Sequence, residues 1–424
     1  MSKSERKKTK TAASGAAKAL PLEVDARAQP PLGMPPADFL RDYWQKQPLL
    51  IRNAFPQYAA ADFQSPLQPE DLAGLACEES ALSRIVMHDR ASDAWTVRSG
   101  PFEEAMFPGM PHQDWTLLVQ DVDKWDADVA AILDSFSFLP RWRIDDVMVS
   151  FAAPGGSVGA HVDQYDVFLL QAQGRRRWQI DAGENPVLEF RDDVELKLLR
   201  QFTPSHEWLL GPGDMLYLPP GVPHHGVAED ACLTFSVGMR APSAAELLGD
   251  FADTLAADAD EALRYRDPDL APPGDPAEID AAAMGRAIEA LNLLRMNDPE
   301  RLGDWFGRFI TLYRNAGEVQ PGGDPDEPPR SRIEIEWDLQ QGASLRRHPW
   351  SRMAWRKATS RGASRLYVNG QDYPLPARDA ARIANAAVLD GAAYAALSDA
   401  GRDLVFELLH AGHYALALPE GIGE

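Results

Sequence analysis

Short apolar runs, separated by glycine, proline or charged residues, dominate the central part of the chain. The runs are rich in β-branched and aromatic residues. They lie at residues 147–151, 167–171, 177–180, 215–218 and 233–237. Runs of this kind predict the strands of an antiparallel sandwich or barrel. We expect a jelly-roll, and similar patterns predict further strands at residues 48–52, 84–87, 95–97 and 116–120.

Helical periodicity replaces the strand pattern after Pro242, at residues 245–257, 280–296 and 299–313. In the second of these predicted helices an apolar stripe is formed by Met284, Ile288, Leu291 and Leu294. Packing within the chain is the common explanation of such a stripe, and contact between two copies in a dimer is the alternative. A helical pattern also occurs earlier, at residues 69–82 and 129–138.

The C-terminal part follows a segment rich in proline, glycine and aspartate at residues 320–330, which is typical of a linker. Residues 333–375 carry strand and turn signals, with a hairpin at 367–370, and residues 377–389 and 399–411 have a helical pattern. We therefore expect a small α+β domain. A solvated basic face, rather than an RNA contact, is expected from Arg346, Arg347, Arg352, Arg356, Lys357 and Arg361.

Composition narrows the class of protein. The 424 residues are 45% hydrophobic, which is enough for two or three domains, and no apolar run is long enough to span a membrane. The two cysteines, Cys77 and Cys232, cannot form a disulfide framework, so a cytoplasmic location is expected. The net charge of -22 disfavours nucleic acid and favours a basic partner. Only residues 1–30 are expected to be a basic, disordered tail.

Candidate chemistry is concentrated in two blocks of the β region. The first contains His161 and Asp163 just before the apolar run at residues 167–170. If this pair lies on a strand, both side chains point to the same face. The second block, residues 211–225, ends in His224 and His225. Two histidines and one carboxylate form the facial triad of non-haem Fe(II) oxygenases, which leaves three coordination positions open.

Only one residue of the second block is expected to complete this triad. Successive residues of an extended chain point in opposite directions, so His224 and His225 cannot both face the metal. We take His224 as the ligand. The predicted metal ligands are therefore His161, Asp163 and His224, and the alternative for the first pair is a hydrogen-bonded structural contact.

The open coordination positions suit 2-oxoglutarate and O2, and the far carboxylate of 2-oxoglutarate needs a cation. Arg175, Arg176 and Arg177 lie on the next predicted strand. If Trp178 and Ile180 share one face of that strand, Arg176 shares it with them. Its guanidinium can form a bidentate pair with a carboxylate. The alternative is a group of solvated arginines at a hairpin.

These blocks resemble the JmjC-domain (cupin-like) ribosomal oxygenase family. The resemblance is carried by residues 145–151, 161–168, 174–178 and 219–224, and it extends to residues 43–50 and 115–122. It is strongest for the bacterial branch that hydroxylates an arginine of ribosomal protein L-sixteen. The family architecture implies a JmjC double-stranded β-helix, a helical dimerisation region and a winged-helix domain.

The domain boundaries expected from the resemblance and from the changes in composition follow the same order. They are a basic tail at residues 1–30, the catalytic domain at 31–243, the helical region at 244–319, a linker at 320–330 and the winged-helix domain at 331–424.

The resemblance also assigns roles to single residues. It implies that His161, Asp163 and His224 hold Fe(II) and that Arg176 anchors 2-oxoglutarate. Ala152 stands where relatives carry a serine near the cosubstrate, and Ser150 could replace that hydroxyl. Tyr165 either lines the substrate channel or belongs to the core.

The expected function is hydroxylation of the β carbon of an arginine in ribosomal protein L-sixteen, dependent on Fe(II), 2-oxoglutarate and O2. The negative charge suits a basic ribosomal protein. The alternatives are a JmjC lysine demethylase, a hydroxylase of another protein, or a non-catalytic cupin-like metal-binding protein. We expect a homodimer that contacts neither membrane nor specific nucleic-acid sequences.

Overall fold

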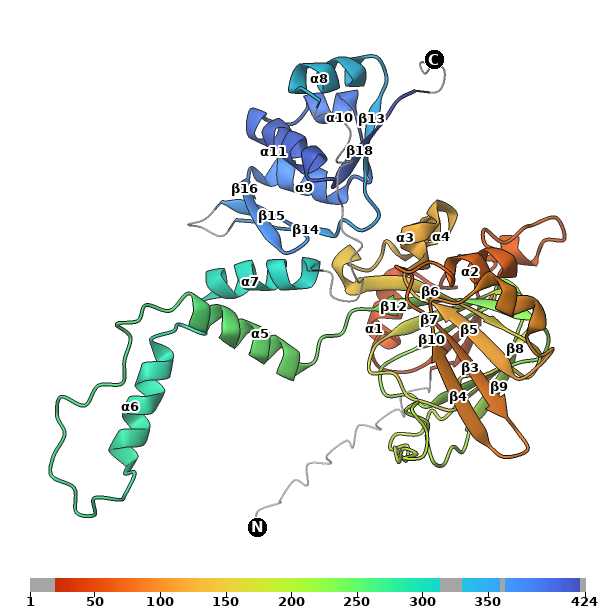
Figure 1. The fold of residues 1–424 in the computed structure, drawn as a ribbon, viewed down its shortest axis with the longest axis horizontal. Helices are drawn as coiled ribbons and strands as arrows, with labels where there is room; N and C mark the ends of the chain where they lie inside the picture. The colour runs from red at the N-terminus through yellow and green to blue at the C-terminus, as the bar shows by residue number, and fades with distance from the viewer. Residues whose placement is uncertain (1–19, 313–329, 359–362, 420–424) are drawn as a thin grey trace, which may run out of the picture.

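The computed structural model describes residues 20–312, 330–358 and 363–419 (Figure 1). A β-rich body forms the N-terminal half, an arm of helices leaves it, and a small domain of helices and strands follows. Residues 1–19 of the predicted tail and 320–329 of the predicted linker lie outside the described residues. The disorder predicted for residues 20–30 is wrong, because Glu23–Asp25 pairs with a neighbouring strand and Ala26 is fully buried. No helix in the described part of the chain has the length and apolar character needed to cross a membrane.

The β-rich body contains a nine-stranded and a three-stranded sheet within the described residues. The larger has the order β1-β2-β10-β7-β12-β6-β5-β3-β4 and the smaller the order β11-β8-β9. Every neighbouring pair except β1–β2 is antiparallel. This is the jelly-roll predicted from the strand pattern. The bounds are β1 Glu23–Asp25, β2 Leu49–Arg52, β3 Ser83–Asp89, β4 Ala94–Ser99, β5 Trp115–Val119, β6 Ile144–Ala152, β7 Val167–Gln173, β8 Arg176–Ile180, β9 His206–Leu210, β10 Met215–Leu218, β11 His224–Ala228 and β12 Cys232–Met239.

Both faces of the large sheet are buried, which explains why its central strands are almost continuously apolar. On β7, Val167 and Leu169 pack toward the small sheet, whereas Phe168 and Leu170 pack on the opposite side with aromatic residues such as Phe39. The site lies on the side that faces the small sheet. The core on the other side holds the strands in position.

Short helices cover that other side: α1 Pro36–Asp42, α2 Pro69–Leu75, α3 Val122–Trp125 and α4 Ala127–Ala131, with 3-10 turns at Pro56–Ala59, Glu104–Gly109, Ile132–Phe136 and Arg141–Arg143. The helix predicted at residues 69–82 ends at Leu75, so its second half was predicted wrongly. The Ala76 carbonyl accepts hydrogen bonds from the Ser83 hydroxyl and the Phe102 N–H. Tertiary contacts therefore provide the hydrogen bonds that a carbonyl at the helix end would otherwise lack. The helix can end here, and the chain continues toward β3.

The helical arm consists of α5 Ala244–Ala257, α6 Ala281–Asn292 and α7 Pro299–Thr311. α5 and α7 share a small core, while α6 extends away from both flanking domains (Figure 1). The stripe of α6 is exposed, with 53% of Met284, 56% of Ile288 and 59% of Leu291 accessible. Packing within the chain is therefore the wrong explanation for this stripe.

The C-terminal domain contains two three-stranded sheets, β17-β13-β18 and β14-β15-β16, together with four helices in its described part. The predicted hairpin is the turn between β15 and β16. Helix α8 was missed, although Ser331 and Glu334 form a capping box at its start. The bounds are α8 Arg332–Gln340, β13 Ser344–Arg347, β14 Met353–Arg356, β15 Ser364–Val368, β16 Gln371–Leu375, α9 Ala377–Asn385, β17 Val388–Asp390, α10 Gly391–Ala395, α11 Asp399–His410 and β18 Tyr414–Ala417.

The solvated basic face predicted for this domain is wrong for three of its arginines. The Arg347 side chain is half-buried, and its guanidinium donates to main-chain carbonyls at the end of α9. Arg352 pairs with Asp145 of the β-rich body, and Arg356 pairs with acidic residues of α7. These three guanidinium groups lie between packed elements, where they form hydrogen bonds and ion pairs instead of facing solvent. Arg361 lies outside the described residues.

Candidate metal centre and substrate pocket

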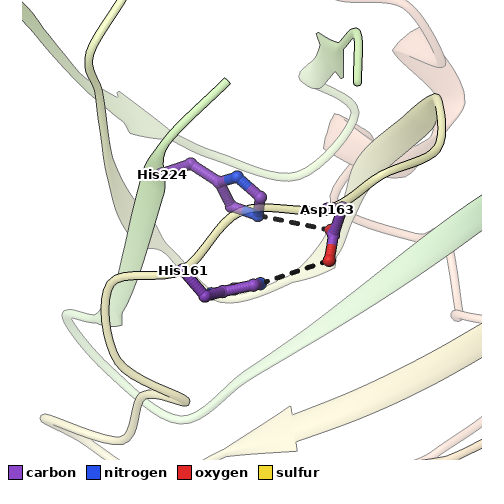
Figure 2. Close-up of side chains that lie close together, drawn as sticks. All are labelled: His161, Asp163 and His224. Carbon is purple, nitrogen blue, oxygen red and sulfur yellow. Dashed lines mark ion pairs between the residues drawn. The ribbon is translucent and has the colours of Figure 1, made fainter. Parts of the chain in front are cut away.

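Three predicted ligand side chains, His161, Asp163 and His224, point toward one another in the cavity between the two sheets (Figure 2). One donor atom from each lies within 4.8 Å of the others. The His161 Nε2 is 3.9 Å from one Asp163 carboxylate oxygen, and the His224 Nε2 is 3.6 Å from the other. Within the described residues no other such cluster of potential ligands is found.

Hydrogen bonds behind the rings orient both histidines. The His161 Nδ1 is 3.0 Å from the Gly159 carbonyl, and the His224 Nδ1 is 2.9 Å from the Val222 carbonyl. Because a carbonyl only accepts, each Nδ1 carries the proton and each Nε2 presents a lone pair toward Asp163. This is the tautomer that metal binding requires.

The backbone also joins the two histidines. The His161 N–H donates to the His224 carbonyl and the His224 N–H to the His161 carbonyl, both at 3.0 Å. The Gly221 N–H donates to the Asp163 carbonyl at 2.8 Å. The three side chains therefore sit on segments that are fixed to one another before any metal binds.

The strand predicted to carry His161 and Asp163 is not present: His161 forms an isolated bridge, and β7 begins only at Val167. The intervening turn is held from behind by Asp166, which is fully buried. Its carboxylate accepts hydrogen bonds from Tyr217 at 2.7 Å and Gln45 at 2.8 Å. This anchor holds the chain in a turn, so His161 and Asp163 reach the site without sharing a strand.

The donor set fits a divalent transition metal. Two neutral imidazole nitrogens and one carboxylate are the ligands of the facial triad, which non-haem Fe(II) prefers. Burial and the neighbouring His161 lower the pKa of His224 to about 4, so His224 is neutral at physiological pH. No proton has to leave this ring before it can bind a metal.

Arg176 lies deeper in the same cavity, on the face of β8 that it shares with Trp178 and Ile180. The guanidinium is buried and contacts neutral oxygens of Ser150, Thr234 and Gly226 at 3.3 to 3.5 Å. Its Nε has no hydrogen-bond partner, and among the described residues no carboxylate pairs with it.

A buried guanidinium without an acid is costly unless an anion binds it. Burial also lowers the pKa of Arg176. The neighbouring arginines, in contrast, are paired at the surface: Arg175 with Asp230, and Arg177 with Glu207 and Glu229. Of the three arginines in this run, Arg176 is therefore the one placed to receive an anionic ligand in the cavity.

The structure shows where His225, the alternative ligand, and Ala152, which stands in place of a serine, are located. The His225 ring points away from the metal cluster and packs edge-on against Phe202, at 6.2 Å between ring centroids. Ala152 does not line the cavity but packs with Ala228 and Cys232. The Ser150 hydroxyl lies in the cavity beside Arg176. A hydroxyl is thus available beside the guanidinium without a serine at 152.

The cavity that holds these groups has a volume of about 510 Å³. Its wall is acidic at the start of β6, four residues along that strand from Ser150, which contacts Arg176. Asp121 enters from the turn after β5, and Asp145 and Asp146 from the first residues of β6. We call these three residues the acidic rim. Tyr165 lines the cavity and is 40% exposed, so it belongs to the wall rather than to the core.

Crowding raises the pKa of two carboxyl groups in the acidic rim. For Asp121, burial and then the charge of Asp146 raise the pKa to about 7. For Asp146, burial raises the pKa to about 6, with smaller contributions from Asp123 and Asp145. A cation entering the cavity would relieve this repulsion and favour the ionised forms.

Comparison with known proteins places the chain in a family. A JmjC domain matches residues 131–247, and a ROXA-like winged helix matches residues 294–415. The Escherichia coli ribosomal protein uL16 3-hydroxylase is 38% identical over 81% of this chain and 86% of that protein. This chain is a JmjC-domain ribosomal oxygenase. A probable ribosomal oxygenase of Haemophilus influenzae is also 38% identical, over 55% of each chain.

Solved structures of ribosomal oxygenases have the same fold. The Escherichia coli ribosomal oxygenase YcfD in complex with cobalt and 2-oxoglutarate is 35% identical, with a TM-score of 0.76 over 91% of this chain and 99% of that chain. Another structure of the same protein gives a TM-score of 0.79. The predicted family and fold class are therefore confirmed.

The acidic rim of this ribosomal oxygenase was missed by the sequence analysis, although a signal was present. Asp121 follows one apolar strand, and Asp145 and Asp146 open the next. In the antiparallel pair of β5 and β6, Val119 lies opposite Val149, so the residues that follow β5 run alongside the first residues of β6. Carboxylates at those positions must meet.

Proposed function

We propose that this ribosomal oxygenase hydroxylates the β carbon of an arginine in ribosomal protein uL16 (L-sixteen), using Fe(II), 2-oxoglutarate and O2. The observation that carries the proposal is a single cavity lined by two kinds of groups. One kind is three metal-type donors with an arginine that has no acidic partner, and the other is three carboxylates.

His161, Asp163 and His224 would hold Fe(II), which supplies the activation of O2 with 2-oxoglutarate as the reductant. Arg176 would pair with the far carboxylate of 2-oxoglutarate, as its unpartnered Nε allows. Ser150 and Thr234 hold the Arg176 guanidinium in place. These residues place two reactants side by side, which is the main contribution of a protein to such chemistry.

The acidic rim would receive the arginine guanidinium of the substrate. Asp121, Asp145 and Asp146 offer carboxylates to a planar cation, and Tyr165 provides a partly exposed ring beside them. A guanidinium bound there leaves the aliphatic part of the side chain directed toward the metal end. The net charge of -22 adds long-range attraction for a basic ribosomal protein.

The test is hydroxylation of purified uL16 by the enzyme loaded with Fe(II) and 2-oxoglutarate, followed by mass spectrometry. We expect a gain of one oxygen atom on one arginine. No gain on uL16, with 2-oxoglutarate still consumed when other ribosomal proteins are added, would assign another protein substrate. Loss of methyl groups from a methyl-lysine peptide panel would favour the demethylase. Metal binding without any consumption of 2-oxoglutarate would favour a non-catalytic cupin-like protein.

A homodimer through the helical arm is the proposed assembly, and the cytoplasm, where ribosomal proteins are made, is the proposed location. The support is the exposed stripe of Met284, Ile288 and Leu291 on α6, because an exposed apolar patch is typical of a surface that contacts another chain. Changing Ile288 to Glu should convert a dimer into a monomer in sedimentation experiments while the fold is kept. An unchanged mass would exclude this face.

A further inference from the structure

In the described part of the chain, the C-terminal domain contacts Asp145 of the cavity wall. Arg352, just before β14, donates through Nη2 to the carbonyl of Asp145 and to its carboxylate, the latter at 2.7 Å. Beside it, Trp350 packs edge-on against Trp125 of α3, with 6.1 Å between ring centroids. The Arg352 side chain is 12% exposed, so this interdomain ion pair is largely shielded from solvent.

Asp145 occupies an irregular place in the sheet. On the partner strand β12, Gly238 pairs with Asp146 and Met239 pairs with Ile144, so Asp145 is the extra residue of a β-bulge. A bulge leaves its extra residue without a ladder partner and redirects the neighbouring side chains. Arg352 binds both the carbonyl and the carboxylate of this residue.

The bulge determines how Asp146 enters the cavity. Its carboxylate lies across from Asp121, whose N–H donates to it at 3.0 Å. Two of the three carboxylates in the acidic rim therefore lie on the bulge, and the third is tied to it. A change in the bulge would move the whole rim.

We propose that Arg352 is a positioning residue for substrate binding, by which the winged-helix domain holds the bulge and so aims the acidic rim at the substrate. This inference rests on the proposed function, because it concerns the guanidinium-binding end of the same cavity. It gives the winged-helix domain a part in the substrate pocket of another domain.

Other cations contact Asp145 at greater distances. The Lys124 ammonium is 3.5 Å from the Asp145 carbonyl, and the Arg240 Nε is 3.9 Å from its carboxylate. The backbone of Arg352 is also held in place, since its main-chain N–H donates to the Asn369 side chain at 2.7 Å. The Asn369 amide in turn donates to the Trp350 carbonyl at 3.1 Å. The contact is thus built into the domain rather than formed by a free surface side chain.

Arg356 provides a matched control. It is the last residue of β14, and its guanidinium pairs with Glu300 at 2.9 Å and Asp304 at 2.6 Å, both on α7. It does not line the cavity. Changing it to Met removes a partly buried, paired arginine from the same domain without touching the bulge.

The experiment measures steady-state hydroxylation of a uL16 peptide by full-length wild type, Arg352→Met, Arg352→Lys and Arg356→Met. We expect Arg352→Met to raise the peptide KM about tenfold with kcat changed less than about twofold, because ground-state positioning is lost. Arg352→Lys should recover part of this loss. Arg356→Met should keep the wild-type KM.

A double-mutant cycle with Asp145→Asn keeps the proposal testable if Arg352→Met folds poorly. Residues that act as a pair give non-additive effects, so the double variant Asp145→Asn/Arg352→Lys should be little worse than Asp145→Asn. Equal KM values for Arg352→Met and Arg356→Met, or additive effects in the cycle, would overturn the inference while the proposed function stands. A wild-type enzyme that leaves the arginine peptide unmodified would overturn both.

Discussion

The two ends of the cavity are built in different ways. At the metal end, His161 and His224 are joined by backbone hydrogen bonds, and Arg176 lies on a regular strand. At the acidic rim, Asp121 comes from a turn, and Asp145 and Asp146 lie on a bulge held by another domain. The metal end attracts an anionic cosubstrate and the rim attracts a cationic substrate.

This difference separates chemistry from recognition. The metal end depends on side chains whose positions follow from strand register and short turns. The rim depends on the contact of Asp121 with β6 inside the β-rich body and on the contact of Asp145 with the winged-helix domain. Loss of a metal donor should therefore abolish turnover, and loss of Arg176 should weaken 2-oxoglutarate binding. Damage at the rim should weaken substrate binding and leave turnover largely intact.

The largest effect is expected from Asp163→Ala, which removes one of three donors from the metal end. Loss of a partner behind a ligand already costs about 10 to 100-fold in metal affinity, so loss of the ligand should exceed about 100-fold. Titration with Co(II) checks this without any turnover, and 2-oxoglutarate consumption should disappear. Asp230→Ala, which removes a surface partner of Arg175, is the control. Wild-type Co(II) affinity in Asp163→Ala would exclude this donor set.

A smaller loss is expected from Arg176→Met, because the metal donors remain. Hydrogen bonds to a charged group contribute about 1.5 to 3 kcal/mol, which corresponds to about 10 to 150-fold in the KM for 2-oxoglutarate. Arg177→Met is the matched control, since Arg177 lies on the same strand but pairs with Glu207 and Glu229 on the outside. If both variants bind 2-oxoglutarate equally well, the anchor lies elsewhere.

At the rim, Asp146→Asn should raise the peptide KM about tenfold, since a partly screened charge pair contributes about 1.4 kcal/mol. The KM for 2-oxoglutarate should not change. Because burial raises the pKa of Asp146, its ionised form is costly in the folded state, and the neutral amide should leave the melting temperature at pH 8 equal or higher. Asp134→Asn, at an exposed site, should change neither value. A lower melting temperature with an unchanged peptide KM would make Asp146 purely structural.

The smallest effect is a dependence of substrate binding on pH. The pKa values of Asp146 and Asp121 are raised to about 6 and about 7, so these groups ionise at a higher pH in the folded protein than in the unfolded chain. Ionisation therefore costs folding stability as the pH rises through about 6 and about 7, and a bound guanidinium recovers part of that cost. The peptide KM should fall several-fold as the pH rises across this range. The KM for 2-oxoglutarate should stay flat, and a flat peptide KM would remove the rim from recognition.

Much of the metal end could be predicted from the sequence, because local patterns carry it. His161 and Asp163 stand two apart, His224 follows a turn-rich block, and alternation on β8 selects Arg176 among three arginines. The prediction failed on the backbone between His161 and Val167. A hydrogen bond to the buried Asp166 from Gln45, more than a hundred residues away, holds that turn, and a local sequence pattern does not reveal such a contact.

The rim and the winged-helix contact were harder to predict for the same reason. The arginine-rich stretch around Arg352 has the composition of a solvated face, and only the packed structure shows Asp145 opposite it. For the apolar stripe of α6, the element was predicted from the sequence but its packing partner was not. Its periodicity correctly predicted a helix with an apolar face, but the pattern cannot tell what covers that face.

The backbone bridge between His161 and His224 has a consequence for how this enzyme can diverge. Since the two ligand segments hold each other directly, the chain between them can lengthen or shorten without changing the spacing of the ligands. The long connection between β8 and β9, residues 181–205, uses this freedom, and its Leu198 reaches the cavity wall. Loops placed on a rigid frame are where binding preferences change most readily. Related enzymes can thus acquire new protein targets through this connection while the oxidation chemistry is inherited intact.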